Sequence, residues 1–210
     1  YEVGRSGDVK QRYEALAAEV SAERSKAALR MQTNITEVMQ TLAMEGGSFE
    51  VSVTPSEHPG PLGTDSCEFL VAGHAGVARR SLAKVASGGE LARVSLAIAV
   101  TDTMTATVDT LIFDEVDSGI GGGVAETVGR LLAQLGEHQQ VLCVTHLPQV
   151  ASCASHHFKI VKHAESKDEA PTSTVIPLDE EERVKEIARM LGGIKITDKT
   201  LEHAKEMLRH

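Results

Sequence analysis

The chain has 210 residues, of which 41% are hydrophobic and 24% are charged, and its formal net charge is −9. These values are ordinary for a globular protein, and a chain of this length is expected to form one domain, or one domain with an appendage. No run of about 18 apolar residues and no secretory signal segment occurs, which argues against membrane insertion and export. The acidic net charge does not suggest a nucleic-acid-binding surface, because duplex binding requires clustered Lys and Arg.

The cysteines indicate the cellular compartment that we expect, and the first residue indicates a fragment. Cys67, Cys143 and Cys153 form no Cys-x-x-Cys motif, and we expect reduced thiols in a cytoplasmic protein. The chain begins with Tyr1 rather than Met, as an excised fragment would.

The first predicted element is an amphipathic helix from about residue 8 to residue 44, a stretch without Pro or Gly. Its apolar residues recur mostly at steps of three and four, which indicates a partial coiled-coil seam. They are Val9, Tyr13, Leu16, Val20, Ala27, Met31, Ile35, Val38 and Leu42. Gly46 and Gly47 are expected to end the helix. A simple surface helix is the alternative interpretation.

Alternating apolar residues predict a half-buried strand over residues 48–54, and a second strand is expected over 67–71. Between them, the Pro- and Gly-rich segment 55–65 is predicted to be a loop. The next predicted helix begins at Ser87 and runs to roughly residue 105.

Apolar runs then predict buried strands over 110–113 and 140–145, on either side of a helix over 124–135. A strand, helix, strand order of this kind is typical of a parallel α/β sheet. The remaining predicted elements are short strands at 158–161 and 173–176 and two helices capped by Asp179 and Thr197. The predicted fold class is therefore α/β.

Three motifs indicate phosphate chemistry. Ser87-Gly88-Gly89-Glu90 precedes a helix, and its free backbone N–H groups could receive a phosphate. Asp114 and Glu115 end an apolar strand, where Asp114 could hold Mg²⁺ through water and Glu115 could accept a proton from an attacking water. His146 closes the next apolar run. Together these residues predict half of a phosphate-hydrolysing site.

The other half is absent from the sequence. No Gly-x-x-x-x-Gly-Lys-Ser/Thr motif occurs, and neither does a Gly-Lys dipeptide, so nothing in the chain can wrap the β-phosphate of a nucleotide in the usual loop. We therefore expect this chain to supply one half of a composite site.

The motifs resemble those of ABC-type ATPases: Ser87-Gly88-Gly89-Glu90 is similar to the signature motif, Asp114-Glu115 to Walker B, Asp117 to the D-loop acid and His146 to the switch histidine. Residues 114–117 resemble the SMC-like branch, which acts on DNA. The run Thr-His-Leu-Pro-Gln-Val-Ala at 145–151 and the pattern Arg-x-x-Glu-Ile-Ala-Arg-Met-Leu-Gly-Gly at 183–193 closely resemble the RecN family of bacterial DNA repair. Ala92 and Gly121 depart from it, since Ser is common at both positions.

The resemblance implies a helical arm over residues 1–46 and the carboxy-terminal lobe of an ATPase head over 47–210. It also implies ATP and Mg²⁺ as cofactors, with the metal on Asp114, catalytic roles for Glu115 and His146, and nucleotide contacts from the signature residues. Those contacts are assigned to Ser87, Gly88, Gly89, Glu90 and Asp117. The implied partners are an amino-terminal head half carrying Walker A, a second head in an ATP-sandwiched dimer, and DNA, in the cytoplasm at the nucleoid.

Two alternatives remain open from the residues. The chain could belong to another SMC-like or MutS-like ATPase, or it could be a non-catalytic module that dimerises through its long helix. A zinc site at His156, His157 and His163 lacks a Cys or acid at a recognisable ligand spacing.

Overall fold

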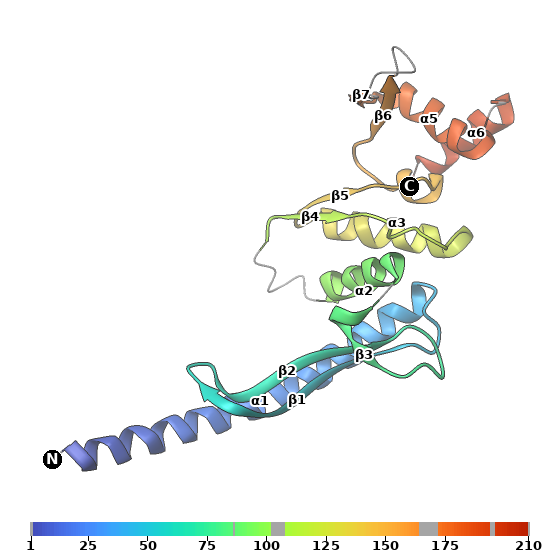
Figure 1. Ribbon diagram of the computed structural model, residues 1–210. Helices are drawn as coiled ribbons and strands as arrows, with labels where there is room; N and C mark the ends of the chain where they lie inside the picture. Colours follow the sequence, from blue (N-terminus) through green and yellow to red (C-terminus); the bar gives the residue numbers. More distant parts are fainter. Residues whose placement is uncertain (1, 86, 102–107, 164–171, 194–195, 210) are drawn as a thin grey trace. The chain divides into compact units, whose positions relative to one another are not determined.

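The computed structural model describes residues 2–85, 87–101, 108–163, 172–193 and 196–209 (Figure 1). The chain forms two compact units, Tyr1–Thr101 and Asp102–His210. The division into a helical arm over residues 1–46 and a head lobe over 47–210 stays a prediction.

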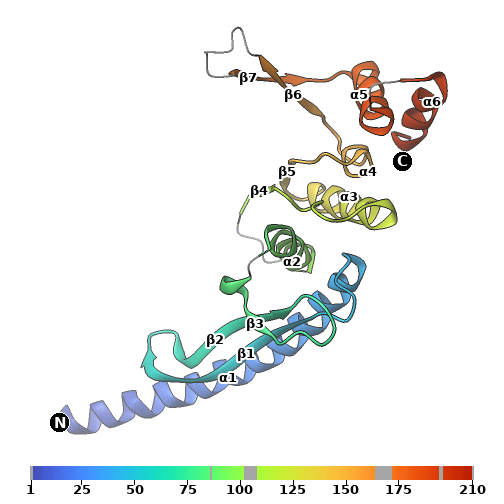
Figure 2. The same cartoon turned by 45° about the vertical axis from the view of Figure 1, so that its right-hand side comes forward.

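In the first unit, helix α1 (Glu2–Thr41) lies along a long antiparallel hairpin made of β1 (Ser48–Gly60) and β2 (Gly63–Ala72), as Figures 1 and 2 both show. The helix is amphipathic, and its carboxy-terminal half buries one apolar stripe that recurs every three, four or seven residues. The buried members of that stripe are Ala28, Ile35 and Met39, and Leu42, directly after the helix, is buried as well. On the sheet side Phe49 is fully buried, and its ring lies 5.4 Å from that of Phe69.

The prediction of a loop over residues 55–65 is wrong, because the strands continue to Gly60 and resume at Gly63. Helix α1 supports this extension. The Tyr13 hydroxyl donates to the carbonyl oxygen of Gly60 (3.0 Å), and Ser21 and Arg24 both donate to the Asp65 carboxylate (2.7 and 3.1 Å). The pairing register shifts between Pro55 and Gly60, which accommodates residues that cannot continue a regular ladder.

The end of α1 also differs from the prediction. The helix stops at Thr41, and the chain turns through Ala43 (φ 56°) and Gly46 (φ 70°) before β1. The unit is completed by β3 (Arg80–Ser81), which pairs with β2, a short 3-10 helix η1 (Leu82–Lys84), and α2 (Gly88–Thr101). The expected continuation of α2 to residue 105 lies outside the described residues.

The second unit contains the predicted parallel pair. Strands β4 (Thr110–Phe113) and β5 (Gln140–Cys143) run parallel, with Thr110 opposite Gln140 and Phe113 opposite Cys143. Helix α3 (Gly122–Gly136) connects them and packs against β5 and the short helix α4 (Pro148–Ala151). The α/β class is thus confirmed, although residues 144 and 145 lie beyond the end of β5.

An antiparallel hairpin and two helices finish the chain: β6 (Phe158–His163), β7 (Thr172–Pro177), α5 (Glu180–Gly192) and α6 (Asp198–Met207). The predicted caps are confirmed, because Asp179 and Thr197 each form a capping box with the residue three positions later. Ile187, Ala188 and Ala204 are fully buried where α5 meets α6.

Candidate functional site

The two predicted acids lie where β4 ends. Asp114 and Glu115 follow Phe113 directly, and both are exposed. Glu115 has a positive φ of 57°, a conformation that costs a non-glycine residue about 1 kcal/mol or more. The Asp114 carboxylate accepts a hydrogen bond from the Glu115 N–H (2.9 Å) and the Ser118 N–H donates to the Glu115 carbonyl (2.9 Å). Because the backbone turns sharply here, strand alternation no longer sets the direction of Glu115.

Asp117, three residues beyond Asp114, is buried with only 3% of its surface exposed. A buried carboxylate needs hydrogen-bond donors to offset its lost hydration. One oxygen of Asp117, Oδ2, accepts from the Thr145 hydroxyl (2.5 Å) and from the backbone N–H of His146 (3.0 Å). The imidazole Nδ1 of His146 lies 3.2 Å from the same oxygen.

The structure therefore brings together the ends of β4 and β5. The Val144 N–H donates to the Phe113 carbonyl (2.9 Å), which keeps the two segments adjacent just beyond the last paired residues of the strands. The carboxyl ends of neighbouring parallel strands are where α/β proteins bind ligands. Asp117 and His146 are in contact at this edge.

Sequence reasoning missed Thr145. Its hydroxyl donates to Asp117 and accepts from the N–H of Leu147 (3.1 Å), so it links the β4 end to the chain on both sides of His146. The available signal was a hydroxyl residue directly before the histidine at a strand end.

The four residues predicted to form the signature motif, 87–90, lie in the first unit. Ser87 precedes α2, and its hydroxyl accepts a hydrogen bond from the Glu90 N–H (3.3 Å), as a helix-capping serine does. Ser87 and Gly88 are exposed, while Gly89 is buried. The Glu90 carboxylate lies 3.6 Å from Nε2 of His74 in the same unit. Of these four predicted residues, Ser87 and Gly88 are thus the most exposed.

The described residues do not form a complete metal centre. Among them, no group of three or more His, Cys, Asp or Glu side chains could hold a metal ion. Asp114 suits Mg²⁺, which often binds through one or two carboxylates, several waters and substrate phosphates. Its exposed carboxylate at the strand end fits that requirement.

The cysteines are all free. Burial, with a smaller effect from the charges of Asp117 and Asp114, raises the pKa of Cys143 to about 12. Burial also raises the pKa of Cys153. Neither thiol is activated as a nucleophile.

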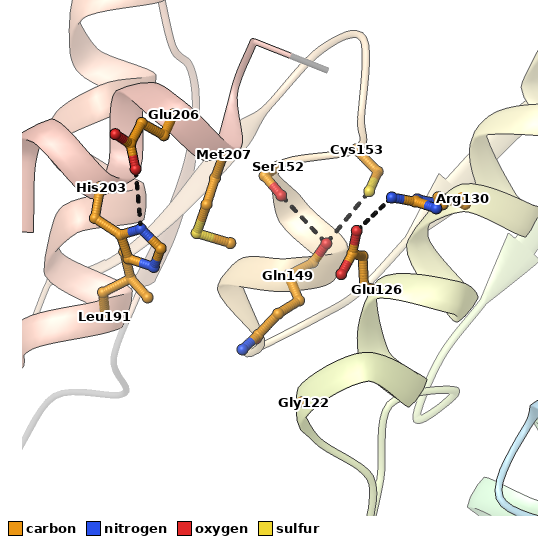
Figure 3. A pocket seen from close by; sticks show the side chains of 10 residues that line it. All are labelled: Gly122, Glu126, Arg130, Gln149, Ser152, Cys153, Leu191, His203, Glu206 and Met207. Carbon is orange, nitrogen blue, oxygen red and sulfur yellow. Dashed lines mark hydrogen bonds and ion pairs between the residues drawn. The ribbon is translucent and has the colours of Figure 1, made fainter.

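A cavity of about 700 Å³ lies elsewhere in the second unit, between α3, α4, α5 and α6 (Figure 3). Its polar side chains include two close pairs, Arg130 with Glu126 (2.5 Å) and His203 with Glu206 (3.7 Å). None of the predicted site residues lines it. The cavity is therefore separate from the strand-end residues described above.

Helices of the membrane-spanning kind, long and apolar enough to cross a bilayer, are not found in the described part of the chain. No protein-family model matches the sequence.

Curated proteins do match it. The DNA repair protein RecN of Vibrio cholerae is 45% identical over 199 residues, covering 94% of this chain and 36% of that protein. RecN of Xylella fastidiosa (strain 9a5c) is 43% identical over 206 residues, covering 97% and 37%. RecN of Bacillus subtilis is 39% identical over 208 residues, covering 92% and 36%. The chain thus spans about a third of the length of these relatives.

Solved structures share the fold. The Smc head domain of Pyrococcus yayanosii, with a coiled coil and joint, has a TM-score of 0.55 at 21% identity, covering 79% of this chain and 29% of that chain. The Smc head domain of Pyrococcus furiosus, with an extended coiled coil, has a TM-score of 0.53 at 20% identity, covering 80% and 39%. The chain is therefore similar to one segment of RecN proteins over nearly its whole length, and it has the fold of an SMC-type head.

Proposed function

We propose that this chain supplies the signature motif, Walker B, the D-loop acid and the switch histidine of an ATP-hydrolysing head. In the intact protein this head would act in the recombinational repair of DNA double-strand breaks. The observation that carries the proposal is the contact between Asp117 and His146 at the carboxyl ends of β4 and β5, directly beside Asp114 and Glu115. The names of the RecN relatives supply the link to DNA repair.

The second unit exposes apolar strand faces, which we expect an intact head to cover. Parallel strands are normally covered on both faces, yet Ile112, Leu142 and Val144 on or beside the β4–β5 pair are 71%, 43% and 55% exposed. On the β6–β7 hairpin, Ile160 and Val175 are paired across the strands and are 59% and 60% exposed. Apolar sheet faces of this kind support a covering segment, and we assign that role to an amino-terminal head half carrying Walker A.

Helix α1 also presents an uncovered stripe. Val9, Leu16 and Val20 are spaced seven and four residues apart and are 64%, 60% and 41% exposed. This spacing suits the seam of a coiled coil, so we infer that α1 is the arm that returns to the head and pairs with an outgoing helix.

Each site residue has a proposed role. Asp114 would hold Mg²⁺ through water, and the ion would neutralise charge on the phosphates when bound. Glu115 would accept the proton of the attacking water, and His146 would contact the γ-phosphate. The exposed backbone at Ser87 and Gly88, at the amino-terminal end of α2, would face the nucleotide of a second head.

The test is the Glu115→Gln variant in a head reconstituted from this chain and the amino-terminal segment of a RecN relative. ATP binding should persist, because the amide keeps the side-chain shape. Hydrolysis should fall by roughly 10²–10⁴-fold, because the amide cannot accept a proton. Glu137→Gln, at the exposed end of α3, is the matched control and should turn over normally.

A wild-type rate in Glu115→Gln would remove Glu115 from the proposed role. Absence of hydrolysis in the wild-type reconstituted head, with dimerisation retained, would favour the non-catalytic dimerisation module instead.

A further inference from the structure

The feature that goes beyond the proposed function is the hydrogen-bonding pattern around Asp117. A single buried oxygen, Oδ2, receives the Thr145 hydroxyl, the His146 backbone N–H and the contact from His146 Nδ1. The Thr145 hydroxyl has one proton to give, and its shorter contact is with Asp117 (2.5 Å) rather than with the Leu147 carbonyl (3.5 Å). Its lone pair accepts from the Leu147 N–H (3.1 Å). Hydrogen bonds that involve Thr145, the His146 N–H and the Leu147 N–H therefore hold the backbone on both sides of the histidine.

This arrangement distinguishes the two ring nitrogens of His146. An ionised carboxylate only accepts hydrogen bonds, so Nδ1 must carry a proton to form a favourable contact with Asp117. In a neutral imidazole the other nitrogen, Nε2, then carries none. The Asp117 side chain is 4% exposed whereas the His146 side chain is 72% exposed, so the ring is anchored at a buried oxygen while most of its surface stays accessible.

We propose that Thr145 and Asp117 act together as positioning residues for His146, holding Nδ1 protonated toward Asp117 and leaving Nε2 as the nitrogen that faces the nucleotide. The part of this inference that concerns the nucleotide rests on the proposed function. The orientation of the His146 ring does not depend on the proposed function, because it follows from contacts within the chain. In the neutral ring Nε2 accepts a hydrogen bond, for example from water. In the charged ring it donates one to a phosphate oxygen, and Asp117 balances the charge.

Thr145 is the informative residue to change, because it touches no proposed ligand. Thr145→Val keeps the shape and removes the hydroxyl, whereas Thr145→Ser keeps the hydroxyl. Thr127, which is partly exposed on α3, donates to the Gly123 carbonyl (3.0 Å), so Thr127→Val is the matched control for loss of a threonine hydroxyl.

The first measurement is long-range ¹H–¹⁵N NMR of the histidine rings in the 210-residue chain, without nucleotide, at a pH of about 8, where an ordinary histidine is neutral. His146→Gln identifies the signals of His146. We expect the Nδ1–H form in the wild type, in Thr145→Ser and in Thr127→Val, and a shift toward the Nε2–H form in Thr145→Val. An Nε2–H form in the wild type, or an unchanged form in Thr145→Val, would overturn the proposal.

The second measurement is ATP turnover by the reconstituted head. Thr145→Val should lower kcat roughly tenfold while KM changes less than about twofold, because a hydrogen bond to a charged group is lost but the nucleotide contacts remain. Thr145→Ser should recover most of the rate. A similar fall of kcat in Thr145→Val and Thr145→Ser would mean that Thr145 has a merely structural role, and it would contradict the proposal. If the wild-type head does not hydrolyse ATP, the proposed function fails while the NMR result still decides the positioning.

Discussion

The contacts of Arg183 and Glu186 show what single residues of the RecN-like pattern at 183–193 do, although this pattern lies outside the nucleotide motifs. Arg183 on α5 donates to the carbonyl oxygens of Ala154 (2.5 Å) and Ser155 (3.2 Å). The buried Glu186 accepts from Lys159 on β6 (2.6 Å) and from Arg189 on its own helix (2.6 Å). These contacts attach α5 to the chain that follows α4, so the pattern has a structural role.

Glu186 also gives a pH-dependent prediction. Burial alone would raise the pKa of Glu186, but the hydrogen bonds from Arg189 and Lys159 outweigh it, and the pKa lies below its ordinary value. A lowered folded-state pKa stabilises the fold above the unfolded value of about 4.3, and this contribution is lost as the pH falls through the folded value.

Glu186→Gln should therefore lower the free energy of unfolding by about 1–2 kcal/mol at pH 7, a modest figure because Lys159 and Arg189 are partly exposed. The difference from the wild type should narrow below about pH 4. Urea unfolding of the chain at several pH values measures it, with Glu202→Gln, an exposed residue of α6, as control. A difference that stays constant down to pH 3 would show that the charge of Glu186 is not the cause.

The same scale shows how far the sequence predicted the site. Asp114, Glu115 and His146 could be placed at strand ends, because apolar runs that stop at polar residues have a clear pattern. The contacts of Asp117 with Thr145 and His146 could not be predicted, because they join residues about 30 positions apart through the packing of β4 on β5.

At the scale of elements, α2 illustrates what the signature segment can do. The helix begins directly after Ser87, whose hydroxyl caps it, and its first N–H groups have no partners within the helix. An anion near this end would be stabilised by those groups and by the helix dipole. We expect that anion to be the γ-phosphate held by a second head.

Ser87→Arg is predicted to block ATP-dependent dimerisation of the reconstituted head while leaving ATP affinity within about threefold, because the added side chain would occupy the space of the approaching phosphate. Ser95→Arg, farther along the same helix at an exposed position, adds the same charge and should dimerise normally. Analytical ultracentrifugation and nucleotide titration, made side by side, provide the comparison. Unchanged dimerisation in Ser87→Arg, or loss of affinity together with dimerisation, would show that the segment does not bind a partner's nucleotide.

The β1–β2 hairpin shows why local sequence patterns did not predict the full length of its strands. Pro and Gly over residues 55–65 are local loop signals, but the side chains of Tyr13, Ser21 and Arg24 hold the extended strands from α1. These partners lie more than 40 positions away in sequence, so local patterns carried no sign of them.

At the scale of the whole molecule, the exposed apolar faces of β4–β5 and β6–β7 and the absence of a phosphate-wrapping loop in the sequence point to one arrangement. The chain covers about a third of its RecN relatives, and we propose that the remaining length supplies the covering segment, the Walker A loop and the outgoing arm. ATP hydrolysis would then be a property of the joined halves.

The most direct test of this central claim is magnesium-dependent ATP turnover, measured for the 210-residue chain alone and after it is joined to the amino-terminal segment of a RecN relative. Turnover should be negligible for the chain alone, because it cannot wrap the nucleotide phosphates, and should appear in the joined protein and be lost with Glu115→Gln. Robust turnover by the chain alone, or none after joining in a protein that binds ATP and dimerises, would contradict the account.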